Sequence, residues 1–238
     1  DVVYVIEVNP RASRTVPFIS KVIDLPLAKL AAQLAIGKNL REMNLNIGSQ
    51  KGLIAVKKPV FPFNKFPQQN VFLSPEMKST GEVIGFDTYL GSAYAKAEAG
   101  AGNSLPVMGA VFISVNDVDK IKAIPLARDF KELGFDIIAT DGTVKLLSEN
   151  GIVANPIFKV GEGRPNIVDA IKNGEVQLVV NTPLGAQSRF DEYEIGRSAI
   201  RYKVPAITTI SGAQAAVRGI RNIKSGTIQY RSLQEEFR

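Results

Sequence analysis

The chain has 238 residues, 45% of them apolar, which is enough for one large globular domain or two of ordinary size. It contains no cysteine and no histidine, so disulfides, thiolate catalysis and imidazole chemistry are excluded. The net charge of +6 is scattered, without a basic run; this favours phosphorylated small molecules over nucleic acid as partners.

The first predicted element is a strand over Val2 to Val8 that ends in polar groups. Alternate side chains of a strand share a face, so Glu7 and Asn9 are expected on one side, about 7 Å apart. A carboxylate and an amide oxygen suit Mg²⁺, whose coordination shell nucleotide phosphates often complete. Arg11 and Arg14 follow with guanidinium groups that suit phosphate oxygens. The alternative is that Glu7 and Asn9 simply mark the polar face of an edge strand.

Two helices and a proline-rich stretch are expected next. Pro26 to Ile36 has apolar residues at helical spacing. Ala55 to Pro75 contains four prolines and four phenylalanines, too much proline for a helix or a central strand, so we expect an irregular packed segment anchored by its phenylalanines. An alanine-rich helix over Tyr89 to Glu98 then leads into a linker over Ala99 to Pro106.

Beyond the linker, strands and helices alternate. Strands are expected over Val107 to Val115, Phe135 to Thr140, Ile157 to Val160, Val176 to Asn181 and Ala206 to Ile210. Helices are expected over Asn116 to Leu133, Gly142 to Asn150, Asn166 to Lys172, Glu192 to Tyr202 and Ala213 to Ile220. This order predicts an α/β fold with a doubly wound parallel sheet. The domains are expected at 1–103 and 104–238.

Ligands of such sheets bind beyond the carboxyl ends of the strands, where this sequence places hydroxyl groups, ammonium groups and glycine turns. Together these groups predict a phosphate cradle, in which Gly142 lets the backbone approach an anion. Taken singly, each threonine can instead be a helix cap and each lysine a solvated charge. The candidates are Ser114, Lys120, Thr140, Thr143, Lys159, Asn181 and Thr182.

Several ordered motifs resemble the large subunit of the carbamoyl-phosphate synthetase family. They are Glu7 to Phe18, Phe61 to Phe66, Pro75 to Val83, and Glu162 to Pro165 followed by Asn181 and Thr182. The resemblance covers nearly the whole chain. It implies that 1–103 is the carboxyl-terminal part of an ATP-grasp α+β domain, truncated at its start. It also implies that 104–238 is a methylglyoxal-synthase-like regulatory domain.

The resemblance further implies that the intact enzyme makes carbamoyl phosphate from bicarbonate, ammonia or glutamine, and ATP, for pyrimidine and arginine synthesis. Glu7 and Asn9 would hold Mg²⁺ or Mn²⁺, and Arg11 and Arg14 would act on phosphate. The seven candidates above would bind an allosteric nucleotide, UMP or IMP; Pro183 replaces a threonine of that motif and leaves the choice open.

The partners implied are the missing amino-terminal part of the same chain, a glutamine amidotransferase small subunit and further copies of the chain. The fragment alone is expected to be inactive, because an ATP-grasp site needs both lobes. Without an apolar run of about eighteen residues or a signal peptide, we expect a cytoplasmic protein with no membrane contact.

Two other functions remain open. The sheet domain could be a lyase for a phosphorylated triose, like its methylglyoxal-synthase relatives, although such chemistry needs a positioned acid and base. Asp141 is the only carboxylate in the cradle motifs, and the chain has no histidine. The chain could also be a structural or assembly module without a ligand.

Overall fold

The computed structural model describes residues 4–5, 8, 11, 13–45, 52–65, 77–182 and 189–236. Glu7 and Asn9 lie outside these residues. Of the strand expected at the start of the chain, the structure describes Tyr4, Val5 and Val8, and none of the three belongs to a strand. Their side chains are 80–81% exposed, so they lack the packing that a strand of a buried sheet would have.

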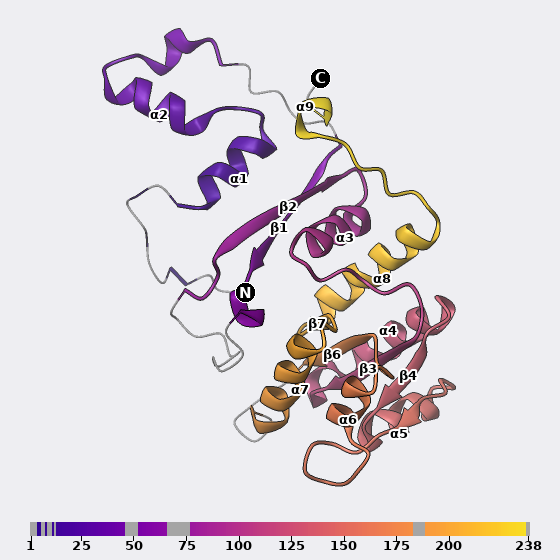
Figure 1. The fold of residues 1–238 in the computed structure, drawn as a ribbon. Coiled ribbons are helices and arrows are strands. Elements are labelled where there is room, and N and C mark those ends of the chain that lie inside the picture. Colours follow the sequence, from indigo (N-terminus) through magenta and orange to yellow (C-terminus); the bar gives the residue numbers. More distant parts are fainter. Residues whose placement is uncertain are drawn as a thin grey trace.

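The first part of the chain forms a helical hairpin, a β-hairpin and one further helix (Figure 1). Its elements are α1 Thr15–Val22, α2 Leu27–Ala35, the 3-10 helix η1 Leu40–Met43, β1 Ile54–Val60, the 3-10 helix η2 Pro62–Asn64, β2 Gly81–Asp87 and α3 Leu90–Gly100. The helices expected over Pro26 to Ile36 and Tyr89 to Glu98 are confirmed as α2 and α3. Helix α1 was not expected; Pro17 lies in its first turn, where a missing N–H costs little.

The expectation of an irregular segment from Ala55 to Pro75 is wrong in its first part, because these residues begin within β1. Strand β1 pairs antiparallel with β2, with Pro59 opposite Glu82. The described part of this sheet has only these two strands, so both are edges, and an edge strand tolerates proline. After β1 the rings of Phe61 and Phe63 stack with centroids 5.2 Å apart, and Phe63 is buried, as expected of a hydrophobic anchor; Phe66 lies outside the described residues.

The second part confirms the expected doubly wound sheet. Its strands are all parallel, in the order β5-β4-β3-β6-β7. The elements are β3 Ala110–Val115, the 3-10 helix η3 Asp117–Asp119, α4 Lys120–Glu132, β4 Asp136–Ala139, α5 Asp141–Glu149, β5 Asn155–Pro156, α6 Ile167–Lys172, β6 Leu178–Thr182, α7 Arg189–Arg201, β7 Ala206–Ile207 and α8 Ile210–Lys224; α9 Leu233–Glu236 follows.

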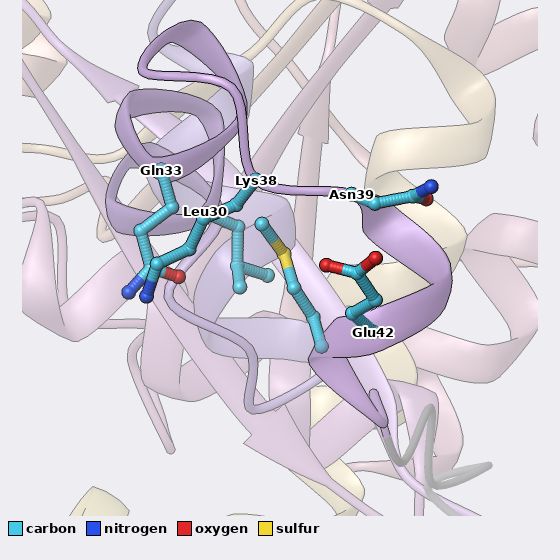
Figure 2. A pocket seen from close by; sticks show the side chains of 6 residues that line it. Leu30, Gln33, Lys38, Asn39 and Glu42 are labelled. Atoms are coloured by element: carbon cyan, nitrogen blue, oxygen red, sulfur yellow. The ribbon is translucent and has the colours of Figure 1, made fainter.

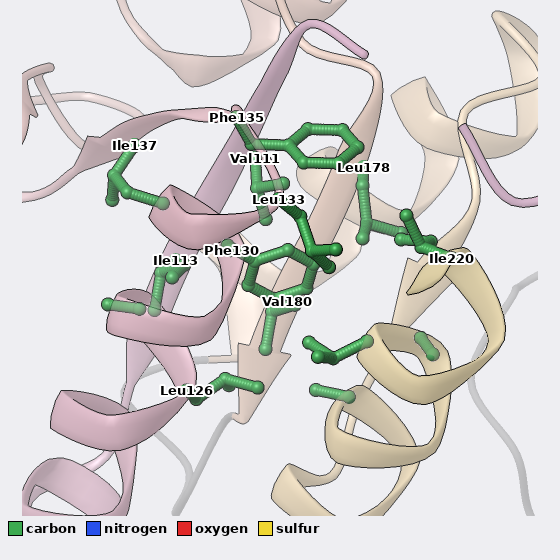
Figure 3. Packing of buried hydrophobic residues seen from close by; sticks show 14 of the residues in the cluster. Val111, Ile113, Leu126, Phe130, Leu133, Phe135, Ile137, Leu178, Val180 and Ile220 are labelled. Carbon is green, nitrogen blue, oxygen red and sulfur yellow. The ribbon is translucent and has the colours of Figure 1, made fainter. Parts of the chain in front are cut away.

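Strand alternation divides the core between the two faces of this sheet. Val111 and Ile113 of β3 pack with residues of α4, α5 and α8, whereas Phe112 between them packs with α6 and α7. Strand β6 repeats the pattern, with Val180 on the first side and Val179 on the second. Figure 3 shows the larger cluster, in which Val180 lies between α4 and α8. The parity of each strand residue therefore fixes which helices it meets.

Both edge strands differ from the sequence prediction, and the inner strands β3 and β6 also begin later than expected, at Ala110 and Leu178. The strand expected over Ile157 to Val160 is wrong: β5 is Asn155–Pro156, and Phe158 forms only an isolated bridge with Asn166. Strand β7 ends at Ile207 because Thr209 caps α8, accepting a hydrogen bond from the Gly212 N–H at 3.1 Å. Short edge strands lack the continuous apolar run that makes an inner strand visible in the sequence.

Helix α3 joins the two parts of the chain. It packs against both strands of the β-hairpin and against α8, and Ala95 of α3 belongs to the same buried cluster as the helices over the sheet (Figure 1). No helix among the described residues is both long and apolar enough to cross a membrane.

Candidate functional site

The candidate site lies where the sheet reverses its winding. Strand β4, the next in the chain after β3, lies on one side of β3, whereas β6 lies on the other. At such a switch point the helices leave on opposite faces and open a crevice at the carboxyl ends of the strands. Ser114 of β3 and Asn181 of β6 are paired in register at this point. By alternation both share the α6–α7 face with Phe112 and Val179.

The two candidate threonines lie at the start of α5. Thr140 occupies the N-cap position, but its side chain makes no capping bond; its carbonyl accepts from the N–H groups of Thr143 and Val144 at 2.8 and 2.9 Å. Both threonine side chains are buried. The hydroxyl of Thr140 therefore does not do the work of a cap. A Cβ on Gly142 would meet no atom within 4 Å, which leaves space beside this backbone.

Both candidate lysines are paired with neighbouring carboxylates. Lys120 begins α4, and its Nζ lies 2.6 Å from Asp117 Oδ1. This ammonium group lowers the pKa of Asp117 through a hydrogen bond and its charge. Lys159 Nζ lies 3.5 Å from Glu162 Oε1, and both side chains are about half exposed. Such exposed pairs are weak, so an incoming phosphate can replace either carboxylate.

The structure adds Asp191 of α7, which sequence reasoning missed. Burial is the main reason why the pKa of Asp191 is raised; the Lys159 charge opposes the shift and the Glu162 charge supports it. The site thus holds three charged groups, Lys159, Glu162 and Asp191, around the turn after β5. Asp141 is accordingly not the only carboxylate near this edge. No spacing in the sequence signals Asp191, because α7 reaches the site only through the fold.

Thr182 lies on the opposite face from Asn181. Its hydroxyl oxygen accepts from the N–H of Asn116 at 3.2 Å and from Asn116 Nδ2 at 3.1 Å. Desolvation would raise the pKa of Asp119, but hydrogen bonds from Asn116, Thr182 and Lys122, together with the Lys122 charge, lower it. Thr182 therefore ties the end of β6 to the turn after β3. It lines a cavity of about 510 Å³ together with Asn116, Asp119, Lys122, Thr208, Thr209, Ile210, Ser211 and Gln214.

In the first part of the chain, Arg11 is exposed, and Arg14 is bound to the segment before β2. Arg14 Nη1 donates to the carbonyl oxygen and to Oγ of Ser79, both at 3.2 Å. Arg14 also lines a groove of about 240 Å³ with Lys57 and Glu82 of the β-hairpin. The described residues contain no group of three acidic or histidine side chains that could hold a metal, and the expected ligands Glu7 and Asn9 lie outside them.

A third cavity, of about 430 Å³, lies between α2 and η1, away from every predicted site residue (Figure 2). Figure 2 shows that its wall mixes an aliphatic side chain, a thioether, amides and charges of both signs. Such a lining selects no particular ligand chemistry. The residues are Leu30, Gln33, Lys38, Asn39, Glu42 and Met43.

Two family models match the chain. The MGS-like domain matches residues 122–208, the greater part of the doubly wound sheet. The carbamoyl-phosphate synthase L chain, ATP binding domain, matches residues 1–43, which include α1 and α2. The second part of the chain is therefore an MGS-like domain.

Several relatives at about 50% identity are named as carbamoyl phosphate synthase large chains or as their C-terminal section. A carbamoyl phosphate synthase large chain from Archaeoglobus fulgidus is 55% identical over 234 residues, and one from Nostoc sp. is 50% identical over 233; each alignment covers 98% of this chain. A carbamoyl phosphate synthase large chain, C-terminal section, from Aquifex aeolicus is 49% identical over 238 residues, with 93% of this chain covered.

The chain is thus similar to carbamoyl phosphate synthase large chains over nearly its whole length. It spans 21–22% of the length of the two full large chains and 44% of the C-terminal section. These names favour a synthase part over the lyase alternative.

Proposed function

We propose that this chain is part of a cytoplasmic carbamoyl phosphate synthase large chain and that its MGS-like domain binds a regulatory nucleotide, UMP or IMP, through the phosphate. The intact enzyme would form carbamoyl phosphate from bicarbonate, ATP, and ammonia or glutamine. The chain alone would not catalyse this reaction. The proposed division of labour follows the two parts of the chain, 1–103 and 104–238.

The observation that carries the nucleotide proposal is the arrangement of polar groups at the switch point. Ser114 and Asn181 are neighbours there on one face of the sheet. Thr140 directly follows β4, and by strand alternation it falls on the same face. Lys159 supplies the positive charge, held by a weak and exposed ion pair. A phosphate can bind the Lys159 ammonium while the hydroxyl and amide groups hold its oxygens or a ribose.

Thr143 and Lys120 complete the proposed phosphate site, and Thr182 acts on it indirectly. Because Thr182 is bound to Asn116, it holds the ends of β3 and β6 together instead of meeting the ligand from the same face. We therefore assign direct contact to Ser114, Lys120, Thr140, Thr143, Lys159 and Asn181.

The first part would complete an ATP-grasp site with the missing amino-terminal part of the large chain. Glu7 and Asn9 would hold Mg²⁺ or Mn²⁺, which neutralises the charge of ATP phosphates, and Arg11 would bind phosphate oxygens. Arg14, bound to Ser79, would position α1 beside the groove. Neither α1 nor α2 has a fully buried residue, so their apolar sides are available to that missing part.

Further partners would be a glutamine amidotransferase small subunit, as the source of ammonia, and additional copies of the chain. Homologues named as C-terminal sections are separate chains, and this supports a division of the large chain at some point before the MGS-like domain.

Calorimetric titration with UMP and with IMP tests the nucleotide proposal. Saturable binding by the unchanged chain should be weakened at least tenfold by Lys159→Ala, since the lost ammonium–phosphate interaction is worth about 1.4 kcal/mol or more. Lys131→Ala is the matched control, because Lys131 also pairs with a carboxylate, Asp136, at 3.2 Å but lies at the other end of the strands. Absence of binding by both nucleotides, or equal losses in both variants, would refute the proposal.

A further inference from the structure

Helix α3 contacts its neighbours at backbone distance on two sides. Towards α8, a Cβ on Gly91 would lie 2.6 Å from the carbonyl carbon of Arg218, and one on Gly219 would lie 3.0 Å from the Gly91 oxygen. Towards the hairpin, a Cβ on Gly85 would overlap the carbonyl oxygen of Ala93. Close backbone packing leaves little room for sliding, since interiors resist deformation. The hairpin, α3 and α8 are therefore in firm contact.

A buried polar network crosses the same contact. Glu98 of α3 is 3% exposed, and its Oε1 accepts from Lys58 Nζ of β1 at 2.7 Å. Tyr94, one turn earlier, hydrogen-bonds Glu98, and burial together with the Glu98 charge raises the pKa of its hydroxyl. The Tyr94 hydroxyl also lies 3.8 Å from the position of a Cβ on Gly212, in the first turn of α8. The hydrogen-bonded network thus runs from Tyr94 and Glu98 of α3 to β1, and its Tyr94 end lies beside the first turn of α8.

This network disfavours any separation of α3 from β1. A buried carboxylate that loses its partner keeps its desolvation cost, so an arrangement that separates Glu98 from Lys58 is strongly disfavoured. Ser92 adds a second polar contact, because its Oγ accepts from Asn222 Nδ2 at 2.9 Å and its side chain is fully buried. Relative movement of α3 and its neighbours would break these bonds.

The two elements next to the network, α8 and β1, each help to line a cavity. The first turn of α8, with Thr209 and Ser211, lines the cavity of about 510 Å³ at the carboxyl edge of the sheet. At the other end, Lys57 is next to Lys58 in β1, and its side chain lines the groove of about 240 Å³ that Arg14 also borders. The network therefore lies between the elements that border the two cavities.

We propose that α3, through Tyr94, Glu98 and Lys58, couples the carboxyl edge of the five-stranded sheet to the β1–β2 hairpin, so that the two respond as one unit. The proposal rests on the proposed function only for the identity of the ligand at the sheet edge. The coupling itself is a property of the chain without ligand.

Hydrogen exchange of the 238-residue chain, read by mass spectrometry on peptides from β1, β2 and β3, tests the coupling without ligand. Ile113→Val weakens the buried centre of β3 mildly and should speed exchange there about tenfold. If the hairpin is coupled to the sheet, peptides from β1 and β2 should accelerate by the same factor. Unchanged exchange in the hairpin would overturn the proposal.

The network variants Tyr94→Phe and Glu98→Gln localise the coupling. In each background, Ile113→Val should still accelerate β3 about tenfold but the hairpin less than about threefold. Glu82→Gln is the matched control. It also neutralises a carboxylate that pairs with a lysine of β1, because Glu82 lies 3.3 Å from Lys57, but this pair does not involve α3. A hairpin response that persists fully in both network variants would overturn the assignment. Tyr94→Phe removes only one hydroxyl, so it remains informative if Glu98→Gln fails to fold.

Added UMP separates this inference from the nucleotide proposal. If calorimetry shows binding, UMP should slow exchange in the hairpin as well as at the sheet edge, and Tyr94→Phe should abolish the hairpin effect without changing affinity. Binding that leaves the hairpin unaffected would contradict the coupling. If UMP and IMP do not bind, the nucleotide proposal fails, while the Ile113→Val comparison still decides the coupling.

Discussion

The contact between α3 and α8 predicts that one substitution, glycine to alanine, has opposite effects at equivalent positions of two helices. Gly91 is the second residue of α3, and Gly142 is the second residue of α5. In a helix, alanine is favoured over glycine by about 1 kcal/mol because it loses less backbone entropy, with a smaller gain in the first turn. The space around the new methyl group decides whether the substitution raises or lowers the free energy of unfolding.

At Gly91 the added Cβ would lie 2.6 Å from the Arg218 carbonyl carbon, 2.7 Å from its oxygen and 2.8 Å from its Cβ. Backbone atoms cannot rotate away, so α3 and α8 must separate, at the upper end of the overpacking cost, about 3 kcal/mol. Subtracting a first-turn helical gain of about 0.5 kcal/mol leaves a net loss of about 2.5 kcal/mol. Gly142 has open space, so Gly142→Ala should stabilise by about 0.5 kcal/mol.

Thermal unfolding followed by circular dichroism measures both variants. For a chain of this size, Gly91→Ala should lower Tm by about 7 °C, and Gly142→Ala should raise it by about 1 °C. Urea midpoints at fixed temperature provide an independent check. A Gly91→Ala chain as stable as the unchanged one would show that the two helices can separate freely, and would refute the reasoning from close backbone packing.

Further expected outcomes concern the site and the core. Gly142→Ala should weaken UMP binding severalfold in calorimetry, since a methyl group would occupy the space that the proposed phosphate needs. Unchanged affinity would show that the ligand does not bind next to α5. The pKa of the Asp191 carboxyl is raised in the folded chain. The contribution of Asp191 to stability is therefore greatest at low pH, and it declines as the pH rises through the pKa of Asp191 in the folded chain. Asp191→Asn should therefore increase the urea midpoint near pH 7 but not near pH 3, and a larger gain at low pH would contradict this sign. Asn166 caps α6 in a capping box, and Asn166→Ala should cost about 1 kcal/mol in urea unfolding, whereas an unchanged midpoint would make the cap irrelevant. Phe112 is fully buried, and Phe112→Ala should cost about 3–5 kcal/mol in the same assay, with a loss below 1 kcal/mol excluding its place in the core.

The doubly wound sheet could be predicted because its inner strands are long apolar runs between helix caps. β3 and β6 are buried on both faces and so show no polar alternation that could be mistaken for another element. The hairpin strand β1 could not be predicted, because proline composition argues against a strand unless the strand is known to be an edge. Whether a strand is an edge depends on pairing, which composition does not contain.

The candidate site was predictable as a set of strand ends but not in its details. Asn181 and Thr182 are adjacent in β6, so the two-residue period of a strand already forbids both from facing one ligand on the same side. This alternation could be read from the sequence. It distinguishes Asn181, which we assign to the ligand, from Thr182, which holds the ends of β3 and β6 together. Asp191 was not available, because its proximity to Lys159 arises from the packing of α7.

The dependence of Glu98 on Lys58 sets a limit on how the MGS-like domain can be transplanted. A biosensor cut at residue 104 would leave the α8 surface at Gly219 bare, since α3 covers it. A biosensor that begins at α3 would contain the buried carboxylate of Glu98 but not Lys58, which pairs with it. The smallest portable module is therefore the block from β1 through α8, and a fluorescent reporter is best attached outside it.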